Sequence, residues 1–383
     1  MRIDKDSWKK SKFSDVIESV TNRIDAPSEA GVERYVGLEH LDPGSMTVNR
    51  WGTPDQVEAT KLLFEKGDVI FGRRRAYQRK VSMADFRGIC SAHALVLRAK
   101  PGLIDPSFLP VFLSSDTFLN LAIKISVGSL SPTVNWKTLA TQEFLFPPLD
   151  QQQEIASTFW ELSKLLNSLK ELSVDLATLK SLVFTECVAN SKNPSTITRL
   201  SKVADLVIGR TPSKSDKSYW TSSQDYPFCT IADMIDGQVS RTKIGVTQKS
   251  LDEGKAKLVK AGTLMMSFKL TVGRLAYAKV NLCPNEAIVA IYPDSELIRL
   301  DFLELTLAHS EFSKNSNRAV MGFTLNSQSL NKIEIVCPHL EMQEQIMSKI
   351  LPIEESIRVI ENEIQTTTNL IEKLNRVFFG GES

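Results

Sequence analysis

One ten-residue segment concentrates the side chains best suited to binding a polyanion. FGRRRAYQRK, at residues 71–80, sets basic residues beside an aromatic ring and an amide: Arg73, Arg74, Arg75, Tyr77, Gln78, Arg79 and Lys80. Arg and Lys neutralise phosphates and bind guanine edges, and Gln can pair with adenine. A solvated basic surface would have a similar composition, so this segment alone gives only a hypothesis of DNA binding.

Two later segments carry similar groups. GRTPSKSDKSYW, at 209–220, supplies Arg210, Thr211, Lys214, Lys217, Tyr219 and Trp220, and SFKLTVGR, at 267–274, supplies Lys269, Thr271 and Arg274. Segment 267–274 follows a strand-like run, as segment 72–80 does, so equivalent loops favour DNA binding over a chance basic surface. Weaker candidates are 127–131, which includes Ser129, and 321–324.

No catalytic pattern accompanies these loops. The sequence has no phosphate-binding GxxxxGK[ST], no GxGxxG, no HExxH, no GxSxG, and no Asn/Asp-Pro-Pro-aromatic tetrapeptide of the amino-methyltransferases. The five cysteines and four histidines have no metal-ligand spacing, which predicts reduced thiols and no metal site. The chain also has no apolar signal core and no run long enough to cross a membrane. We therefore expect a soluble, cytoplasmic protein without catalytic residues or a membrane segment.

The loops belong to an internal repeat. At an offset of 191 residues, Pro147 aligns with Pro338, Gln152 with Gln343, and Thr133-Val134-Asn135 with Thr324-Leu325-Asn326. With small gaps, KGDVIFG also aligns with AGTLMMS, and CSAHALVL with CPNEAIVAI. Each copy is a long mixed segment followed by a helix, and the polar stretch 189–196 joins them. The predicted divisions are 1–146, 147–190, 191–337 and 338–383.

Charge follows the same division. Basic residues outnumber acidic ones by 3 in residues 1–146 and by 5 in 191–337, whereas acidic residues are in excess by 3 in 147–190 and by 4 in 338–383. The two long segments are thus the ones suited to a polyanion.

Both shorter segments have coiled-coil periodicity. The first has apolar residues at steps of three and four: Ile155, Phe159, Leu162, Leu166, Leu169, Leu172, Leu176, Leu179 and Val183. The second repeats those steps with Ile346, Ile350, Ile353, Ile357, Ile360, Ile364, Thr367, Ile371, Leu374 and Phe378. One such stripe would more often pack on a domain core, but two matched stripes favour an antiparallel pair. Residues 155–183 would span about 43 Å. Pro352 predicts a kink or a late helix start.

Short apolar runs bounded by Gly, Pro and charge, such as DVIFG, ALVLRA and AIVAIYP, predict short strands in the long segments. The expected fold class is α+β. Two globular domains would alternate with two long helices that pair as an antiparallel coiled coil, with pseudo-twofold symmetry.

Taken together, these motifs resemble the specificity subunit of a type I restriction-modification system. FPPLDQQQEI and CPHLEMQEQI resemble the signature that opens each helical region, and GRTPSKSDKSYW, PFCTIADM and TVGRLAYA resemble the opening and middle of a target-recognition domain. Segment 66–100 resembles another common version of that domain. His339, Met342 and Glu286 depart from the usual residues at their positions.

The resemblance implies a non-catalytic subunit. Each recognition domain would read one half of a bipartite, asymmetric target in double-stranded DNA, and the helices would bind two methyltransferase subunits, directing adenine methylation and, with restriction (motor) subunits, cleavage. S-adenosylmethionine, ATP and Mg²⁺ would belong to those partners, and this chain would need no cofactor. Two other interpretations stay open from the residues. One is a coiled-coil scaffold whose globular domains bind proteins, and the other is an enzyme with an unrecognised site.

Overall fold

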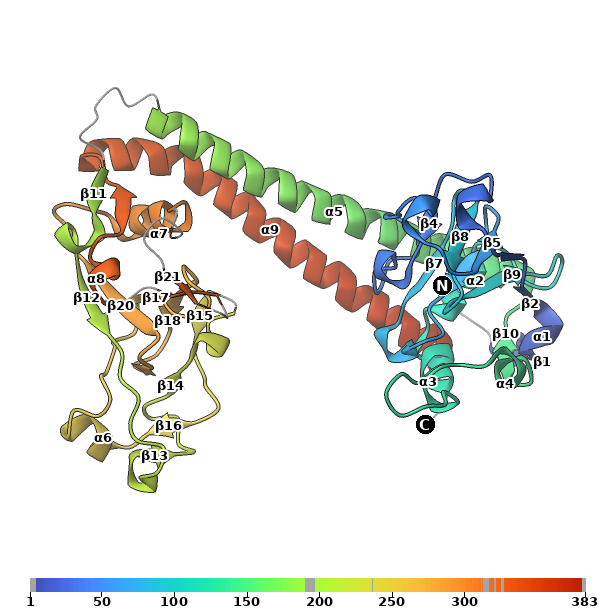
Figure 1. Cartoon of the computed structure of the whole chain (residues 1–383), viewed down its shortest axis with the longest axis horizontal. Coiled ribbons are helices and arrows are strands. Elements are labelled where there is room, and N and C mark those ends of the chain that lie inside the picture. The colour runs from blue at the N-terminus through green and yellow to red at the C-terminus, as the bar shows by residue number, and fades with distance from the viewer. Residues whose placement is uncertain are drawn as a thin grey trace. The chain divides into compact units, whose positions relative to one another are not determined.

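The computed structural model describes residues 5–189, 197–235, 237–310, 312, 317–319, 322–324 and 327–380. The chain divides into two compact units, one made of 1–173 with 359–383 and the other of 174–358. Each unit combines one α+β domain with part of both long helices, α5 (Leu149–Ala189) and α9 (Leu340–Phe379) (Figure 1). The α+β class, with two globular domains and two long paired helices, is confirmed.

The first unit contains two four-stranded sheets. One has the order β2-β9-β6-β7, and the other has the order β3-β5-β8-β4. The strands of the first sheet are β2 (Ile17–Val20), β9 (Leu95–Ala99), β6 (Val69–Phe71) and β7 (Val81–Met83). Those of the second are β3 (Arg23–Ile24), β5 (Lys61–Phe64), β8 (Gly88–Ser91) and β4 (Tyr35–Val36). A two-stranded ribbon, β1 (Lys9–Lys12) with β10 (Glu143–Phe146), leads into α5.

Strand β6 shows why this domain has two cores. Val69 and Phe71 point to the core on the helix side of the sheet, and Ile70 points to the smaller core on the other face. Because side chains alternate along a strand, a strand covered on both faces needs an unbroken apolar run. The helices are α1 (Phe13–Val16), α2 (Phe108–Leu113), α3 (Asp116–Lys124) and α4 (Trp136–Ala140).

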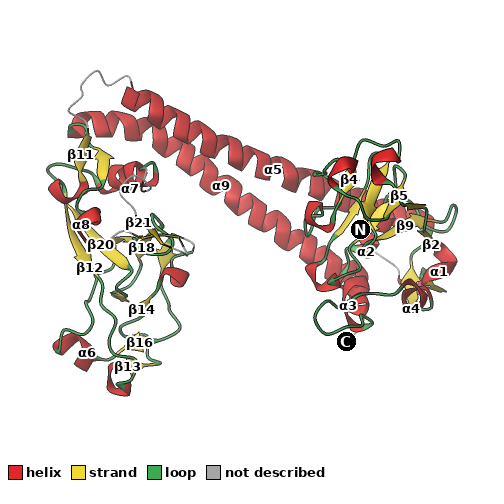
Figure 2. Ribbon diagram, in the orientation of Figure 1, coloured by secondary structure: helices red, strands yellow, loops and turns green. Residues whose placement is uncertain are grey.

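The second unit is built around a five-stranded sheet of order β12-β20-β17-β18-β15. Its strands are β12 (Ala204–Ile208), β20 (Ile288–Pro293), β17 (Leu264–Ser267), β18 (Leu275–Ala278) and β15 (Gln238–Val239). The two-stranded ribbons are β11 (Ile197–Arg199) with β23 (Glu334–Val336), β13 (Trp220–Thr221) with β16 (Gly245–Val246), β14 (Phe228–Cys229) with β19 (Cys283–Pro284), and β21 (Asn317–Ala319) with β22 (Gly322–Thr324). The helices are α6 (Gln248–Asp252), α7 (Leu300–Ala308) and α8 (Ser327–Leu330) (Figure 2).

Short 3-10 turns complete both units: η1 (Lys5–Ser7), η2 (Pro27–Glu29), η3 (Leu38–His40), η4 (Pro54–Gln56), η5 (Ala76–Gln78), η7 (Leu200–Lys202), η8 (Lys217–Tyr219) and η9 (Ile231–Asp233). The two domains share a topology. Order β2-β9-β6-β7 in the first corresponds to β12-β20-β17-β18 in the second, and a parallel pair stands beside each, β4 with β8 and β14 with β19. The repeat inferred from the sequence is therefore also a repeat of fold.

The long helices pair in opposite directions, as Figure 1 shows. In the first unit, the rings of Phe159 and Phe378 have centroids 5.9 Å apart. In the second, Lys180 Nζ lies 2.9 Å from Glu354 Oε1. Residue numbers rise along α5 as they fall along α9, which is the antiparallel arrangement. We call the line of contact between the two helices the seam. The apolar residues expected in the seam are all buried or half-buried: Ile155, Phe159, Leu162, Leu166, Leu169, Leu176, Ile346, Ile350, Ile357, Ile360, Ile364 and Leu374.

Two positions of the predicted seam are wrong. Leu172 and Leu179 are 46% and 45% exposed, whereas Ser173 and Lys180 are half-buried. The seam of α5 runs through Leu166, Leu169, Ser173, Leu176 and Lys180 in strict steps of three and four. A coiled-coil seam keeps facing the partner helix when steps of three and four alternate. The predicted positions 166, 169 and 172 instead place two steps of three in succession, which shifts Leu172 and Leu179 out of the seam.

A late start of α9 at Pro352 is also wrong, because the helix begins at Leu340 and continues through the proline. Figure 1 shows a change of direction in the N-terminal part of α9, the part that contains Pro352. This agrees with the predicted kink, since proline removes one helical N–H and crowds the preceding turn.

A buried glutamine joins each helix to its domain. Gln152 is 1% exposed, and its Nε2 donates to the carbonyl oxygens of Leu103 and Pro147 while its Oε1 accepts from the Asp105 N–H. Gln343 is fully buried. It repeats this pattern with Leu297 O, Pro338 O and the Arg299 N–H, at 2.9, 2.7 and 2.9 Å. The repeated glutamine of the helix signature thus satisfies three backbone groups at each joint.

Candidate nucleic-acid interface

Strand pairing gathers the candidate loops at one end of each sheet. In the first domain, the end of β6 faces the starts of β9 and β7, because Phe71 pairs with Leu95 and with Val81. In the second, Ser267 pairs with Ile288, and Ile208 pairs with Val289. Antiparallel neighbours bring the end of one strand beside the start of the next. The loops that follow β6 and β17, and those that follow β2 and β12, therefore share an edge with the turn that precedes β9 or β20.

The loop 72–80 has a constrained backbone. Arg75 and Arg79, on either side of η5, have φ of 59° and 55°, in the left-handed region. Residues other than glycine seldom adopt it, and holding one there costs about 1–3 kcal/mol. The surrounding contacts hold this shape, since the Arg75 N–H donates to Pro132 O at 2.7 Å and the Arg79 N–H donates to Ala76 O at 2.9 Å.

Three segments converge around the arginines. Arg73 Nη2 donates to Ala92 O at 3.2 Å, and Arg74 Nη1 lies 3.4 Å from His93 Nε2. Arg74 and Arg75 each donate to Ser131 Oγ at 3.4 Å. The structure thus brings 72–80, the β8–β9 turn and 127–133 together, and Ser129 lies exposed within the last of these.

The remaining residues of the loop divide into exposed and anchored groups. Tyr77 is exposed and Gln78 is half-buried. Arg79 forms an ion pair with Asp116 at the start of α3, and Lys80 Nζ donates to Leu38 O at 2.6 Å. Arg79 and Lys80 thus hold the loop to the domain in this structure, whereas Arg75 and Tyr77 are exposed.

His93 was missed by the sequence analysis, which treated the histidines only as possible metal ligands. Burial lowers the pKa of His93, and the positive charges of Arg74, Arg73 and Lys61 lower it further. Its imidazole is therefore held in the neutral form at neutral pH, inside a basic cluster. A histidine in the short turn before a buried strand was the available signal, but only strand pairing places it beside Arg74.

In the second domain, Arg274 and Lys269 flank the β17–β18 loop. Arg274 Nη1 donates to Ile231 O at 3.0 Å, and Lys269 Nζ lies 5.5 Å from the centroid of the Phe268 ring. Ser267 Oγ donates to Thr271 O, which closes the loop. Gly273 has φ of 87°, and a Cβ there would meet the Phe312 ring at 2.5 Å, so the turn requires glycine.

The segment 209–220 separates into an exposed and a packed part. Arg210, Lys214 and Lys217 are exposed, and Arg210 Nη1 donates to Gly254 O at 2.9 Å. Tyr219 is buried, and its hydroxyl donates to Glu253 at 2.6 Å, which raises the pKa of Tyr219 to about 12. Trp220 Nε1 donates to Ser213 O, and its ring packs on Phe228. Both aromatic residues therefore shape the loop, and their proposed DNA contacts stay predictions.

The candidate segment 321–324 falls mainly outside the described residues, since Met321 and the side chains of 322–324 are not described. Within the described ranges, no group of three or more His, Cys, Asp or Glu could hold a metal ion. The same part of the chain contains no helix both long and apolar enough to span a bilayer.

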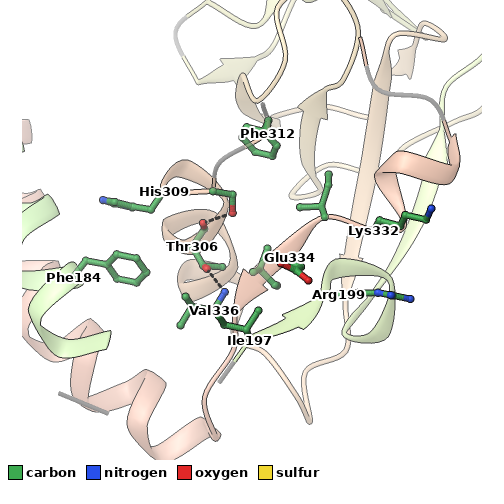
Figure 3. A pocket seen from close by; sticks show the side chains of 12 residues that line it. Phe184, Ile197, Arg199, Thr306, His309, Phe312, Lys332, Glu334 and Val336 are labelled. Carbon is green, nitrogen blue, oxygen red and sulfur yellow. Dashed lines mark hydrogen bonds between the residues drawn. The ribbon is translucent and has the colours of Figure 1, made fainter. Parts of the chain in front are cut away.

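A cavity of about 350 Å³ in the second unit lies where α5 meets the domain (Figure 3). Phe184 of α5 packs on the His309 ring, with centroids 4.5 Å apart, and the Val336 N–H donates to Thr306 Oγ1 at 3.0 Å. Arg199 and Lys332 lie at the opposite side of the cavity from His309. None of the predicted DNA-binding residues lines this cavity, which belongs to the joint between helix and domain.

Comparison with known proteins gives a family match across both repeats. The model of the type I restriction modification DNA specificity domain matches residues 5–175 and again residues 194–369. Among curated proteins, the HindI specificity subunit of Haemophilus influenzae is 28% identical over 171 residues, 43% of this chain and 36% of that protein. The EcoDI specificity subunit of Escherichia coli is 26% identical over 151 residues, 39% of this chain and 33% of that protein. The chain thus spans about a third of the length of these relatives.

Solved structures share the fold over the whole chain. The type I restriction-modification S subunit from M. genitalium matches with a TM-score of 0.61, at 13% identity, covering 100% of this chain and 99% of that one. A chain from a structure of complex assembly and conformational transition of the type I R-M system matches with a TM-score of 0.55, at 19% identity, covering 98% of both.

Proposed function

The chain belongs to the type I restriction modification DNA specificity family, and we propose that it is a non-catalytic subunit that reads a bipartite, asymmetric target in double-stranded DNA. The observation that carries this proposal is the presence, in both domains, of basic loops at the same end of equivalent sheets. The residues in these loops differ between the domains. Two similar scaffolds with unlike loops suit two unlike half-sites.

The helices have a surface suited to a protein partner. In the first unit, Leu165, Leu172, Leu370 and Val377 are exposed outside the seam, and in the second, Val174, Leu179, Leu182 and Leu351 are exposed. Leu165, Leu172 and Leu179 repeat every seven residues and so lie along one side of α5. Each unit thus offers apolar side chains to one methyltransferase subunit, so the chain would bind two. Restriction subunits would join that assembly.

The chemistry would reside in those partners. S-adenosylmethionine would be held by the methyltransferase subunits, and ATP and Mg²⁺ by the restriction subunits. This chain would supply the sequence selection, and the methyltransferase would take the target adenine out of the duplex.

Mapping of methylated adenines tests the function. The chain should be co-expressed with a methyltransferase subunit encoded beside it, and the host DNA analysed by long-read sequencing. We expect methylation at a split motif, with two short half-sites around a fixed gap. An active assembled complex that leaves no sequence-defined methylation would contradict DNA reading and favour a scaffold role.

Replacing Leu172 with glutamate should weaken methyltransferase binding by about tenfold, because the exposed leucine would be buried at that interface. The helices should remain paired, since Leu172 lies outside their seam. Association is measured by titrating the purified methyltransferase. Ala177→Glu is the matched control, since it adds the same charge to an exposed position about 140° around α5. Equal effects of the two changes would contradict the proposed surface.

DNA affinity should increase as the pH falls from 7.5 to 6, in part through His93. Its pKa is lowered in the free protein by burial and by nearby cations. A DNA phosphate would offset those cations and raise the pKa, so binding would take up a proton and be favoured at lower pH. Fluorescence anisotropy across this range should show a smaller increase for His93→Gln than for wild type or for His339→Gln. An unchanged pH dependence in His93→Gln would contradict this role.

A further inference from the structure

A carboxylate lies among the basic loops of the second domain. Glu286 is exposed in the turn between β19 and β20, and Thr211 Oγ1 donates a hydrogen bond to it. Thr211 adjoins Arg210, so Glu286 belongs to the same cluster as the predicted DNA-binding residues.

The backbone fixes the position of this turn. The Asn285 N–H donates to Cys229 O at 3.0 Å, and Asn285 Oδ1 accepts from the Ala287 N–H at 3.0 Å. Gly209 passes so close that a Cβ there would lie 2.2 Å from both Pro284 O and Asn285 O. Glycine is therefore required at 209, and the turn that carries Glu286 is held between packed backbones.

Both candidate loops of the domain contact this turn. The Arg210 N–H donates to Pro284 O at 3.0 Å, and the Phe268 N–H donates to Ala287 O at 2.9 Å. Phe268 is the first residue of the loop that contains Lys269 and Arg274. Glu286 thus lies between the two basic loops on a shared support.

Electrostatics indicates what such a group would do. A carboxylate near DNA repels the phosphates and lowers general affinity. It becomes favourable when it accepts a hydrogen bond from an exocyclic amino group in the major groove, as Asp and Glu do with cytosine N4. Adenine N6 offers the same donor. Thymine and guanine present carbonyl oxygens at the corresponding edge, which a carboxylate rejects.

We propose that Glu286 is a specificity-determining residue that accepts a hydrogen bond from the amino group of a cytosine or adenine in the half-site of the second domain. The inference rests on the proposed function and extends it to one residue. Thr211 holds the carboxylate in place, and the basic loops on either side bind the phosphates.

The first domain provides a contrast. In its β8–β9 turn, the Ala94 N–H donates to Ser91 O at 2.9 Å and the His93 N–H donates to Ser91 Oγ at 3.2 Å, the pattern seen at Asn285. That turn carries His93 beside Arg73 and Arg74. The turn therefore carries an imidazole among arginines in the first domain and a carboxylate in the second.

The test is methylation mapping of the assembled complex carrying Glu286→Gln. A glutamine amide can both donate and accept a hydrogen bond, so it does not reject a base that presents a carbonyl oxygen. One position of a single half-site is expected to be cytosine or adenine in wild type. At that position, methylated sites with thymine or guanine should become at least tenfold more frequent. The other half-site and the gap should not change. Affinity for non-target duplex should rise, because one repulsive charge is removed. Glu286→Ala should relax the same position. Glu296→Gln is the matched control, with the same charge change at the other end of β20.

The outcomes separate the inference from the function. An unchanged motif in Glu286→Gln and Glu286→Ala would overturn the role of Glu286 while leaving DNA reading intact. Loss of all methylation by an assembled variant would also overturn it, since the residue would then be needed for binding in general. Absence of any motif in wild type would instead overturn the proposed function.

Discussion

Replacing Gln343 with alanine should lower the free energy of unfolding of the second unit by about 3 kcal/mol. The change removes three hydrogen bonds of a fully buried side chain, with Leu297 O, Pro338 O and the Arg299 N–H. Those backbone groups would stay buried without their partner, and each unsatisfied group costs about 1–3 kcal/mol, partly offset by water entering the space. The joint between α9 and its domain should loosen before the sheet does.

Native-state hydrogen exchange measures this effect, because the Arg299 amide is itself one of the donors and should lose its protection. The matched control is Gln345→Ala, two residues further along α9 and exposed. Gln152→Ala should have the equivalent effect in the first unit, at the Asp105 amide. If Gln343→Ala and Gln345→Ala left the Arg299 amide equally protected, the buried glutamine would have no structural role.

Replacing Arg74 with alanine should reduce the DNA affinity of the assembled complex by about 10- to 100-fold, or about 1–3 kcal/mol. Arg74 lies where the loop 72–80, the β8–β9 turn and 127–133 meet, through His93 and Ser131. Its removal takes away one cation and disturbs the support of Arg75, which shares Ser131. If Arg74 contacts a phosphate, the slope of log affinity against log salt should fall by about 1.

Titration of labelled target duplex at several salt concentrations gives both quantities. Arg87→Ala is the matched control, since Arg87 is paired with Glu65 at 3.0 Å and precedes β8, at the opposite end of that strand from the β8–β9 turn. Arg274→Ala should weaken binding in the same way through the second domain. Association with the methyltransferase should remain intact in these variants, and its loss would contradict the role assigned to the loops.

The coiled coil shows which positions apolar periodicity can predict and which it cannot. The apolar residues that the sequence assigns to the seam of α9 are all buried or half-buried. On α5, leucines occur both in the seam and beside it, so apolarity could not separate Leu172 from Ser173. The antiparallel partner decided the register, and Lys180 took a seam position because Glu354 lies opposite.

The sequence by itself determined the duplicated α+β layout, the two paired helices and the basic loops after equivalent strands, because these follow from apolar periodicity and from motifs that repeat along the chain. Only the tertiary structure decided which loops meet. His93 reaches Arg74, and Glu286 reaches Thr211, through strand pairing between segments 19 and 75 residues apart. It also decided that Tyr219 and Arg79 are anchored by carboxylates while Tyr77 is exposed. Those outcomes depend on contacts between distant residues, which no local pattern encodes.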